Sequence, residues 1–194
     1  MVICGLDECG RGALAGPLVA GAVVLSDTYE KIVGLLPSPL RDSKRMTKLQ
    51  RQHIYDLRDH IPITFSIESI SVDEINEKGI TWANKEIFIR LSRQIKADQY
   101  LVDGNISFQE SGFISVVHGD NLHPQIMMAS VLAKVYRDRL MATLHNEHPL
   151  YHWDRNVGYG TGEHISALSK FGLTPHHRQL FAYSALKKVI LSEK

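Results

Sequence analysis

Residues 2–25 read VICGLDECGRGALAGPLVAGAVVL, and this stretch decides the fold. An apolar run from Val2 to Leu6 ends at two acids, Asp7 and Glu8, and a second apolar run ends at Leu25. A glycine-rich connection lies between the two runs. Short apolar runs bounded by turn residues are typical of buried strands. The stretch therefore predicts two strands joined by a hairpin-like loop, with two carboxylates where the first strand ends.

The rest of the chain combines the periodicities of strands and helices. Residues 63–67, 100–102 and 113–117 have the pattern of strands. Capping boxes, Thr47 with Gln50 and Ser71 with Glu74, each open a helix. Further helices are predicted near residues 83–95, from Pro124 to about 145, near 163–171 and from about 180. We expect a mixed α/β sheet in a single domain over 1–194, of which about 150–194 form a helical C-terminal extension.

The composition is that of an ordinary globular protein. The chain has 194 residues, 22 Lys and Arg against 21 Asp and Glu, and 44% apolar residues. Its longest apolar run, Leu18 to Leu25, is far shorter than the ~20 residues of a membrane span, and no signal-peptide pattern precedes it. Two cysteines, Cys4 and Cys9, do not make a disulfide framework. We expect a cytoplasmic protein that works without a membrane, and we expect a monomer.

The net charge of +1 conceals a segregation of charge along the chain. Residues 41–58 and residues 155–194 each contain six basic and two acidic residues, so each segment carries +4 and the remainder carries −7. Such segments are commonly solvated helix faces. Charge runs alone favour that interpretation, and the segments become candidates for following the phosphates of a nucleic acid only if the acids gather elsewhere.

Three predicted strands are followed by carboxylates: Asp7 and Glu8, then Asp103, then Asp120. The functional crevice of an open α/β sheet lies outside its strand ends, so acids far apart in sequence can converge there. Clustered like charges need a raised pKa or a bound cation, and oxygen ligands suit Mg²⁺ or Mn²⁺. For any one of these acids alone, an exposed loop acid is the favoured interpretation.

Gly10-Arg11-Gly12 directly follows the first pair of acids. Glycines let a backbone approach a ligand closely, and exposed N–H groups beside an arginine can hold a phosphate or a sugar hydroxyl. Taken alone the tripeptide is also compatible with a surface turn.

Together these residues resemble the type 2 ribonucleases H, the ribonuclease HII family. Asp7 to Gly12 is similar to the family's D-E-A-G-R-G signature, with Cys9 in place of alanine. The other matching segments, in family order, are Asp42 to Thr47 (D-S-K-K-L-T), Leu101 to Asn105 (V-D-G-N), Gly119-Asp120 (G-D), Ala129 to Asp138 (A-S-I-I-A-K-V-x-R-D), Gly158 to Thr161 (G-Y-x-T) and His177-Arg178 (H-R). The resemblance spans residue 3 to about 182.

The resemblance implies a ribonuclease H-like fold with a mixed five-stranded sheet flanked by helices. It implies a metal-dependent endonuclease that cleaves the RNA strand of RNA/DNA hybrids and cuts 5′ to ribonucleotides embedded in duplex DNA. Two-metal-ion catalysis with Mn²⁺ or Mg²⁺ would leave a 3′-hydroxyl and a 5′-phosphate. The implied metal ligands and catalytic residues are Asp7, Glu8, Asp103 and Asp120. The implied substrate-binding residues are Gly10, Arg11 and Gly12 at the 2′-hydroxyl, Tyr159 at the sugar, and Lys44, Lys134 and Arg178 at phosphates.

Three alternatives remain at this point. Ribonuclease HIII has a similar fold, but it typically carries an N-terminal domain for which a first strand starting at residue 2 leaves no room. A binding module without catalysis would gain nothing from acids beside phosphates. A zinc hydrolase using His145, His148 and His152 is disfavoured because Pro149 interrupts the helix that would align them. We also expect that oxidation of Cys9, which lies next to the acids, would lower activity. A sliding clamp is a further candidate partner, at the C-terminus.

Overall fold

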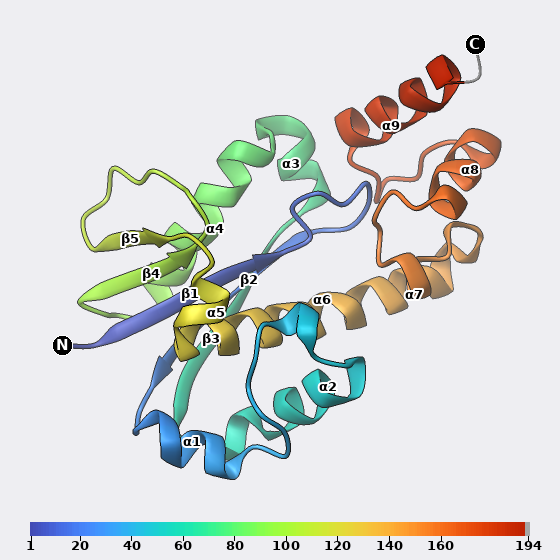
Figure 1. The fold of residues 1–194 in the computed structure, drawn as a ribbon. Helices are drawn as coiled ribbons and strands as arrows, with labels where there is room; N and C mark the ends of the chain where they lie inside the picture. Colours follow the sequence, from blue (N-terminus) through green and yellow to red (C-terminus); the bar gives the residue numbers. More distant parts are fainter. Residues whose placement is uncertain (193–194) are drawn as a thin grey trace. The chain divides into compact units, whose positions relative to one another are not determined.

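The computed structural model describes residues 1–192, with side chains through residue 188. Its five strands form one sheet in the order β3-β2-β1-β4-β5 (Figure 1). β1 pairs antiparallel with β2 and parallel with β4, which pairs parallel with β5. The strands are β1 (Ile3–Cys9), β2 (Leu18–Leu25), β3 (Ile63–Ile70), β4 (Gln99–Asp103) and β5 (Phe113–Val116). The predicted mixed five-stranded sheet is confirmed.

Helices flank the sheet and continue to the C-terminal end of the described chain (Figure 1). The α-helices are α1 (Tyr29–Leu35), α2 (Lys48–Leu57), α3 (Val72–Lys78), α4 (Ile80–Gln94), α5 (Gly119–Leu122), α6 (Pro124–Glu147), α7 (Trp153–Asn156), α8 (Gly162–Phe171) and α9 (Gln179–Ser192). Short 3₁₀ turns occupy Ser43–Arg45, Arg58–His60 and Pro149–Tyr151. Among residues 1–192, no helix combines the length and the apolar character needed to span a bilayer.

The contacts divide the chain into two compact units. Unit 1 contains Met1–Cys9, Val19–Ser69 and Lys85–Val135, and therefore most of the sheet. Unit 2 contains Gly10–Leu18, Ile70–Asn84 and the chain from Tyr136 onward. The predicted C-terminal extension is thus grouped with the glycine-rich loop, and the single domain over residues 1–194 stays a prediction.

In unit 1 the first half of α6 lies directly against β1 and β2. A Cβ atom on Gly5 would stand 2.3 Å from the backbone carbon of Gln125, and one on Gly21 would stand 2.6 Å from the carbonyl oxygen of Ala129. Asp7 pairs with Gly21 and lies two residues after Gly5, so all three face the helix. Glycine at these two positions therefore allows the helix to come close to Asp7.

The first strand is longer than its apolar run predicts. The sequence places Asp7 and Glu8 at the end of this strand, and the pairing with β2 includes both acids and continues one residue further, with Glu8 opposite Ala20 and Cys9 opposite Val19. The reason is that the backbone ladder to an apolar neighbour persists after the side-chain pattern has become polar. Both acids therefore lie within a hydrogen-bonded strand.

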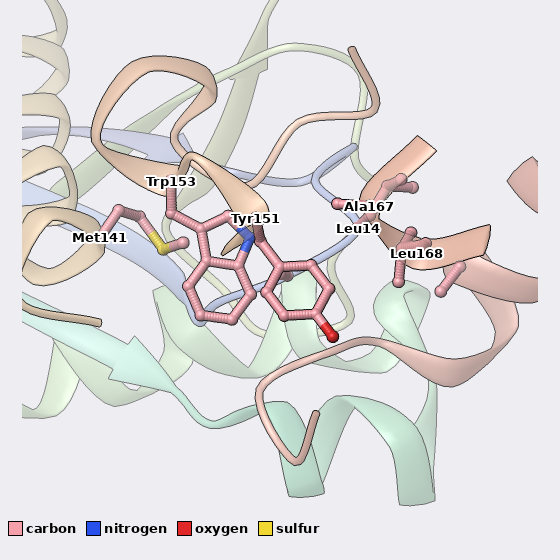
Figure 2. Close-up of a cluster of buried hydrophobic side chains, with 8 residues drawn as sticks. Leu14, Met141, Tyr151, Trp153, Ala167 and Leu168 are labelled. Carbon is pink, nitrogen blue, oxygen red and sulfur yellow. The ribbon is translucent and has the colours of Figure 1, made fainter. Parts of the chain in front are cut away.

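Unit 2 has an apolar core of its own, built around aromatic side chains (Figure 2). The rings of Tyr151 and Trp153 stack with centroids 5.3 Å apart, and Trp153 is fully buried. Figure 2 shows Met141 beside Trp153, with Leu14 and residues of α8 completing the cluster. Leu14 places the glycine-rich loop in this core.

Candidate active site

The sheet brings two of the predicted carboxylates side by side. Leu6 of β1 is in register with Val102 of the parallel strand β4, so the next residues, Asp7 and Asp103, are neighbours. Asp120 lies in the first turn of α5, and its backbone N–H donates to Asp103 Oδ1 at 3.3 Å. Glu8 follows Asp7 on β1, and its N–H donates to Asp7 Oδ1 at 2.8 Å. Asp7, Asp103 and Asp120 therefore lie together in unit 1, and the charge of Glu8 acts on Asp7 from the next position of β1.

Asp7 is a deeply placed member of this group of carboxylates, at 6% exposed. Burial raises its pKa well above the usual range, and the negative charges of Glu8 and Asp103 raise it further. A hydrogen bond from Ser130 and one from the Glu8 N–H act in the opposite direction. The site thus holds a carboxylate whose charge the protein compensates only in part.

The turn before α5 brings Asp120 next to Asp103 of β4. Burial raises the pKa of Asp103, and the charge of Asp120 adds to that effect. Gly119 sits between them, where a Cβ would lie 3.4 Å from Asp103 Oδ1 and 2.6 Å from Ile126. His118 has a left-handed backbone with φ of +58°. A β-branched side chain would be strained in this conformation, whereas histidine adopts it more readily. The residue at position 118 therefore helps to form the turn that presents Asp120.

Lys44 extends toward the same carboxylates. Its ammonium lies 3.5 Å from Asp120 Oδ2. Burial acts to lower its pKa, but the charges of Asp120, Asp42 and Asp7 outweigh that effect and leave the pKa raised. Lys44 is therefore a cation of the acidic cluster, while its predicted phosphate contact stays a prediction.

Two buried serines support the cluster and carried no predicted role. Ser43 Oγ and Ser130 Oγ are 2.9 Å apart, and Ser130 bonds the Asp7 carboxylate. Ser43 belongs to the 3₁₀ turn before α2, and Ser130 to α6. In the sequence, each is marked only by being a serine within a segment that resembles the family, Ser43 in Asp42 to Thr47 and Ser130 in Ala129 to Asp138. Lys134 follows Ser130 by one helical turn on α6, so it projects from the same helix face.

In unit 2 the predicted substrate loop presents Arg11 and Gly12 to solvent, whereas Gly10 is buried. Gly10 has φ of +92°, and a Cβ there would stand 2.1 Å from Arg137 Nε. A Cβ on Gly12 would meet no atom of the described residues within 4 Å, and its φ is not left-handed. Backbone geometry and packing therefore require glycine at position 10 but not at position 12.

Arg178 and Arg137 fix this loop from beneath. Arg178 donates to the carbonyls of Gly16, Gly10 and Arg11 at 2.7–3.0 Å, and its side chain is fully buried. Arg137, also fully buried, donates to the carbonyls of Pro17, Ala15 and Val157. Sequence reasoning assigned Arg178 to a phosphate and gave Arg137 no role. Their placement indicates that both guanidinium groups shape the loop.

Tyr159 lies next to the same supports, half-buried. The guanidinium of Arg137 lies over its ring at 5.5 Å from the centroid. Gly158, just before it, accepts bonds from the Leu14 and Ala15 N–H groups, and a Cβ there would stand 2.4 Å from the Ala15 oxygen. The Tyr159 segment and the loop are thus joined through their backbones.

Comparisons with known proteins agree with this geometry. The family model described as ribonuclease HII matches residues 4–184. The ribonuclease HII of Rickettsia canadensis (strain McKiel) is 43% identical over 187 residues, covering 94% of this chain and 91% of that protein. The ribonuclease HII of Wolbachia pipientis wMel is 44% identical over 187 residues, covering 93% and 90%.

Solved structures share the fold at lower sequence identity. The ribonuclease H2 of Pyrococcus horikoshii OT3 has a TM-score of 0.78 at 22% identity, covering 97% of this chain and 98% of that one. The RNase HII in a complex with PCNA from Archaeoglobus fulgidus has the same TM-score and identity, covering 92% and 94%. A Bst-RNase HIII in complex with Mn²⁺ has a TM-score of 0.69 at 14% identity, and the match covers 96% of this chain but 70% of that one.

The family model spans nearly the whole chain, and relatives above 40% identity match over more than nine-tenths of it. These matches separate the chain from the HIII type, which it resembles in fold alone. The chain belongs to the ribonuclease HII family and is a hydrolase of the ribonuclease H kind.

Proposed function

We propose that this enzyme is a divalent-metal-dependent endonuclease that cleaves the RNA strand of RNA/DNA hybrids and cuts 5′ to ribonucleotides embedded in duplex DNA. The observation that carries the proposal is that Asp7 and Asp103 lie on neighbouring strands, with Asp120 of α5 bonded to Asp103 and Glu8 next to Asp7. A cluster of acids with a raised pKa at its buried member suits cation binding, because a cation would relieve the repulsion.

The donor set fits Mg²⁺ or Mn²⁺, since all four side chains offer carboxylate oxygens. Bound in a pair, such ions supply the charge that activates water and stabilises the leaving 3′-oxygen. The Mn²⁺ in the complex of Bst-RNase HIII belongs to that protein, but it agrees with this choice. Asp7, Glu8, Asp103 and Asp120 would hold the ions, and the donor set accepts either metal.

In the proposed reaction a water oxygen attacks phosphorus, the bond to the 3′-oxygen breaks, and a 3′-hydroxyl and a 5′-phosphate remain. Lys44, already 3.5 Å from Asp120, would offset negative charge as the scissile phosphate approaches. Ser130 would keep the Asp7 carboxylate oriented through its hydrogen bond. Lys134 would contribute a phosphate contact from α6.

Selection for a ribonucleotide would rest on the loop that begins two residues after Glu8. The 2′-hydroxyl is the group that distinguishes RNA from DNA at one site. Among the described residues, none packs against the position of a Gly12 side chain, so a ribose would have room against the backbone of Gly10 to Gly12. Arg11 is exposed beside them for a phosphate, and Tyr159 offers a ring to the adjoining sugar.

The partners proposed are RNA/DNA hybrids and DNA duplexes with embedded ribonucleotides, which suits a role in ribonucleotide removal during DNA repair and replication. A clamp partner is proposed only by analogy with the archaeal complex, which is a property of that protein. Residues 193–194, at the C-terminus where such a partner was predicted, lie outside the described residues.

The test is cleavage of a DNA duplex that contains one ribonucleotide, with and without Mg²⁺ or Mn²⁺. The wild-type enzyme should cut once, on the 5′ side of the ribonucleotide, only when metal is present, and Asp7→Asn should be inactive. An all-DNA duplex is the matched substrate control. Cleavage without metal, or full activity of Asp7→Asn, would refute the metal assignment. Cutting only in long hybrids would refute the embedded-ribonucleotide activity.

A further inference from the structure

A second set of metal-ligand residues lies in unit 2, at the end of α6. Glu147 is the last residue of α6, His148 follows it, and His176 lies between α8 and α9. Their ligand atoms all lie within 4.8 Å of one another. His176 Nε2 is 3.9 Å from Glu147 Oε2, and the imidazole rings of His148 and His176 have centroids 5.2 Å apart.

We propose that Glu147, His148 and His176 bind Zn²⁺ at a site separate from the four carboxylates. Two imidazole nitrogens and one carboxylate oxygen are a typical zinc ligand set, with water completing a tetrahedron. The ligand type also sorts the ions, because imidazole favours Zn²⁺ whereas an all-carboxylate set favours Mg²⁺ or Mn²⁺. The two sets in this chain would therefore bind different metals.

The two histidines are held in place before any ion arrives. The ring of buried Trp153 makes edge contacts with both, at 5.6 Å to His148 and 6.2 Å to His176. The His176 N–H donates to Thr174 Oγ1, and its carbonyl accepts a bond from the Gly16 N–H at 2.9 Å. Fixed ligands lose little conformational freedom when they bind, which favours affinity.

The carboxylate provides the adjustment that the site needs. Ligand atoms around a tetrahedral zinc ion with bonds of about 2.0–2.1 Å stand roughly 3.4 Å apart. The Glu147 carboxylate is 3.9 Å from His176 Nε2, somewhat more than that separation. Because the Glu147 side chain is 60% exposed, it can rotate toward the histidines without disturbing the core. A cavity of about 350 Å³ borders His176, together with Leu144 and Pro175.

The histidines that the sequence spacing suggested do not form this site. His145 lies with its Nδ1 3.3 Å from Asp154 Oδ1, and His152 is in a left-handed turn. Only His148 of that trio takes part, with a partner 28 positions further along. The fold, rather than the spacing, therefore assembles the ligands.

The ion would stabilise the support of the substrate loop. His176 is bonded through its carbonyl to Gly16, and it precedes His177 and Arg178, whose guanidinium holds Gly10 and Arg11. Zinc would tie this segment to the end of α6. The expected effect is a higher Tm, because a ligand that binds only the folded state stabilises it.

The experiment is Zn²⁺ binding to untagged, full-length, metal-stripped protein by equilibrium dialysis in saturating Mg²⁺, which occupies the carboxylates. We expect one equivalent of Zn²⁺ and a higher Tm. His148→Gln and His176→Gln should each weaken Zn²⁺ binding by at least the roughly 10–100-fold that loss of a group supporting a ligand costs, and each should abolish the Tm rise. His53→Gln, which changes an exposed histidine of α2, should behave as wild type.

Circular dichroism of each variant confirms folding, and Co²⁺ absorption gives an independent signal of tetrahedral coordination. Absence of Zn²⁺ binding in Mg²⁺, or binding unchanged in both folded histidine variants, would overturn the proposal. If His176→Gln fails to fold, the comparison rests on His148→Gln and Glu147→Gln. Because the readout is binding and not cleavage, its failure would leave the proposed nuclease activity untouched.

Discussion

Neighbouring glycines in the substrate loop are glycine for different reasons. Gly10 is needed for its left-handed backbone and for the room that Arg137 occupies, whereas nothing within the described part of the protein requires glycine at position 12. Gly12→Ala should therefore leave the free energy of unfolding within about 0.5 kcal/mol of wild type, yet cleavage at a single ribonucleotide should fall sharply. Urea unfolding and a cleavage assay on the same preparation check both parts.

Gly10→Ala is the matched comparison for this prediction. It should destabilise the fold by about 1–3 kcal/mol, because the methyl group meets a buried guanidinium and the backbone is strained. Wild-type cleavage by Gly12→Ala would remove the loop's proposed role at the 2′-hydroxyl.

The charged Asp7 side chain should lower the stability of the metal-free fold, although cleavage requires it. Its pKa is raised by burial and by Glu8 and Asp103, so its favourable contribution exists below its unfolded pKa of 3.8 and is lost as pH rises through the folded value. At neutral pH and without metal, Asp7→Asn should therefore raise Tm by a few degrees while eliminating cleavage. Scanning calorimetry of metal-stripped protein measures this, with Asp59→Asn as an exposed control. An unchanged or lower Tm in Asp7→Asn would contradict the electrostatic argument.

At the scale of elements, the glycine-rich loop depends on Arg178. A positioning role and a phosphate contact make different predictions for Arg178→Lys. If the arginine holds three carbonyls, lysine cannot reproduce the fork, and cleavage should fall by roughly 100-fold with faster amide hydrogen exchange at Ala13 and Leu14. Arg155→Lys, at an exposed position of α7, is the control.

The alternative outcome is equally specific. If Arg178 contacted a phosphate, lysine would largely restore activity, and Arg178→Gln would reduce the salt dependence of hybrid binding. Retained protection of the loop in Arg178→Lys would thus reject the positioning role.

Elements with a local signal could be predicted. Both capping boxes are present in full at Thr47 and Ser71, and Gly79 ends α3 with φ of +82°. The end of β1 was predicted to within one residue, since the strand was expected to end at Asp7 and Glu8 and its pairing with β2 continues to Cys9. Helix α1 escaped prediction since Thr28 makes no side-chain capping bond and only Ile32 of its residues is buried.

For the whole molecule, acid should weaken the fold through buried histidines. The Nε2 atoms of His164 and His177 are 3.1 Å apart, and burial lowers both pKa values, that of His177 to about 4. A depressed histidine pKa gives stability that is complete above the unfolded value of 6.5 and is lost as pH falls toward 4. The loss should be on the order of 2–3 kcal/mol.

Urea unfolding of wild type and His177→Gln as a function of pH tests this. Asp7 and Asp103 have raised pKa values and act in the opposite direction, so the informative quantity is the difference between the two proteins. That difference should shrink below pH 6.5, and His53→Gln should track wild type. Parallel curves over the whole range would show that His177 is not protected from protonation.

From hydrophobic patterning alone, the site could be predicted only at acids that follow apolar runs. Asp7, Asp103 and Asp120 follow apolar runs, which is why residues more than a hundred positions apart could be grouped in advance. Ser130 and Arg137 could not be assigned, because they lie within a long helix and their partners are contacts of the folded chain, such as Ala15 at 122 positions from Arg137. Contacts of that kind leave no periodic trace in the sequence.

The close approach of α6 to the sheet has a consequence for protein engineering. At Gly5 and Gly21 any side chain would collide with backbone atoms of the helix, which cannot move aside as a flexible side chain could. A saturation library screened only for expression should thus reject nearly every substitution at these two positions, while it accepts many at Gly12. A second screen for nuclease activity should then eliminate the variants at Gly12. The first screen would thus identify the glycines that folding requires, and the second would identify those that only cleavage requires.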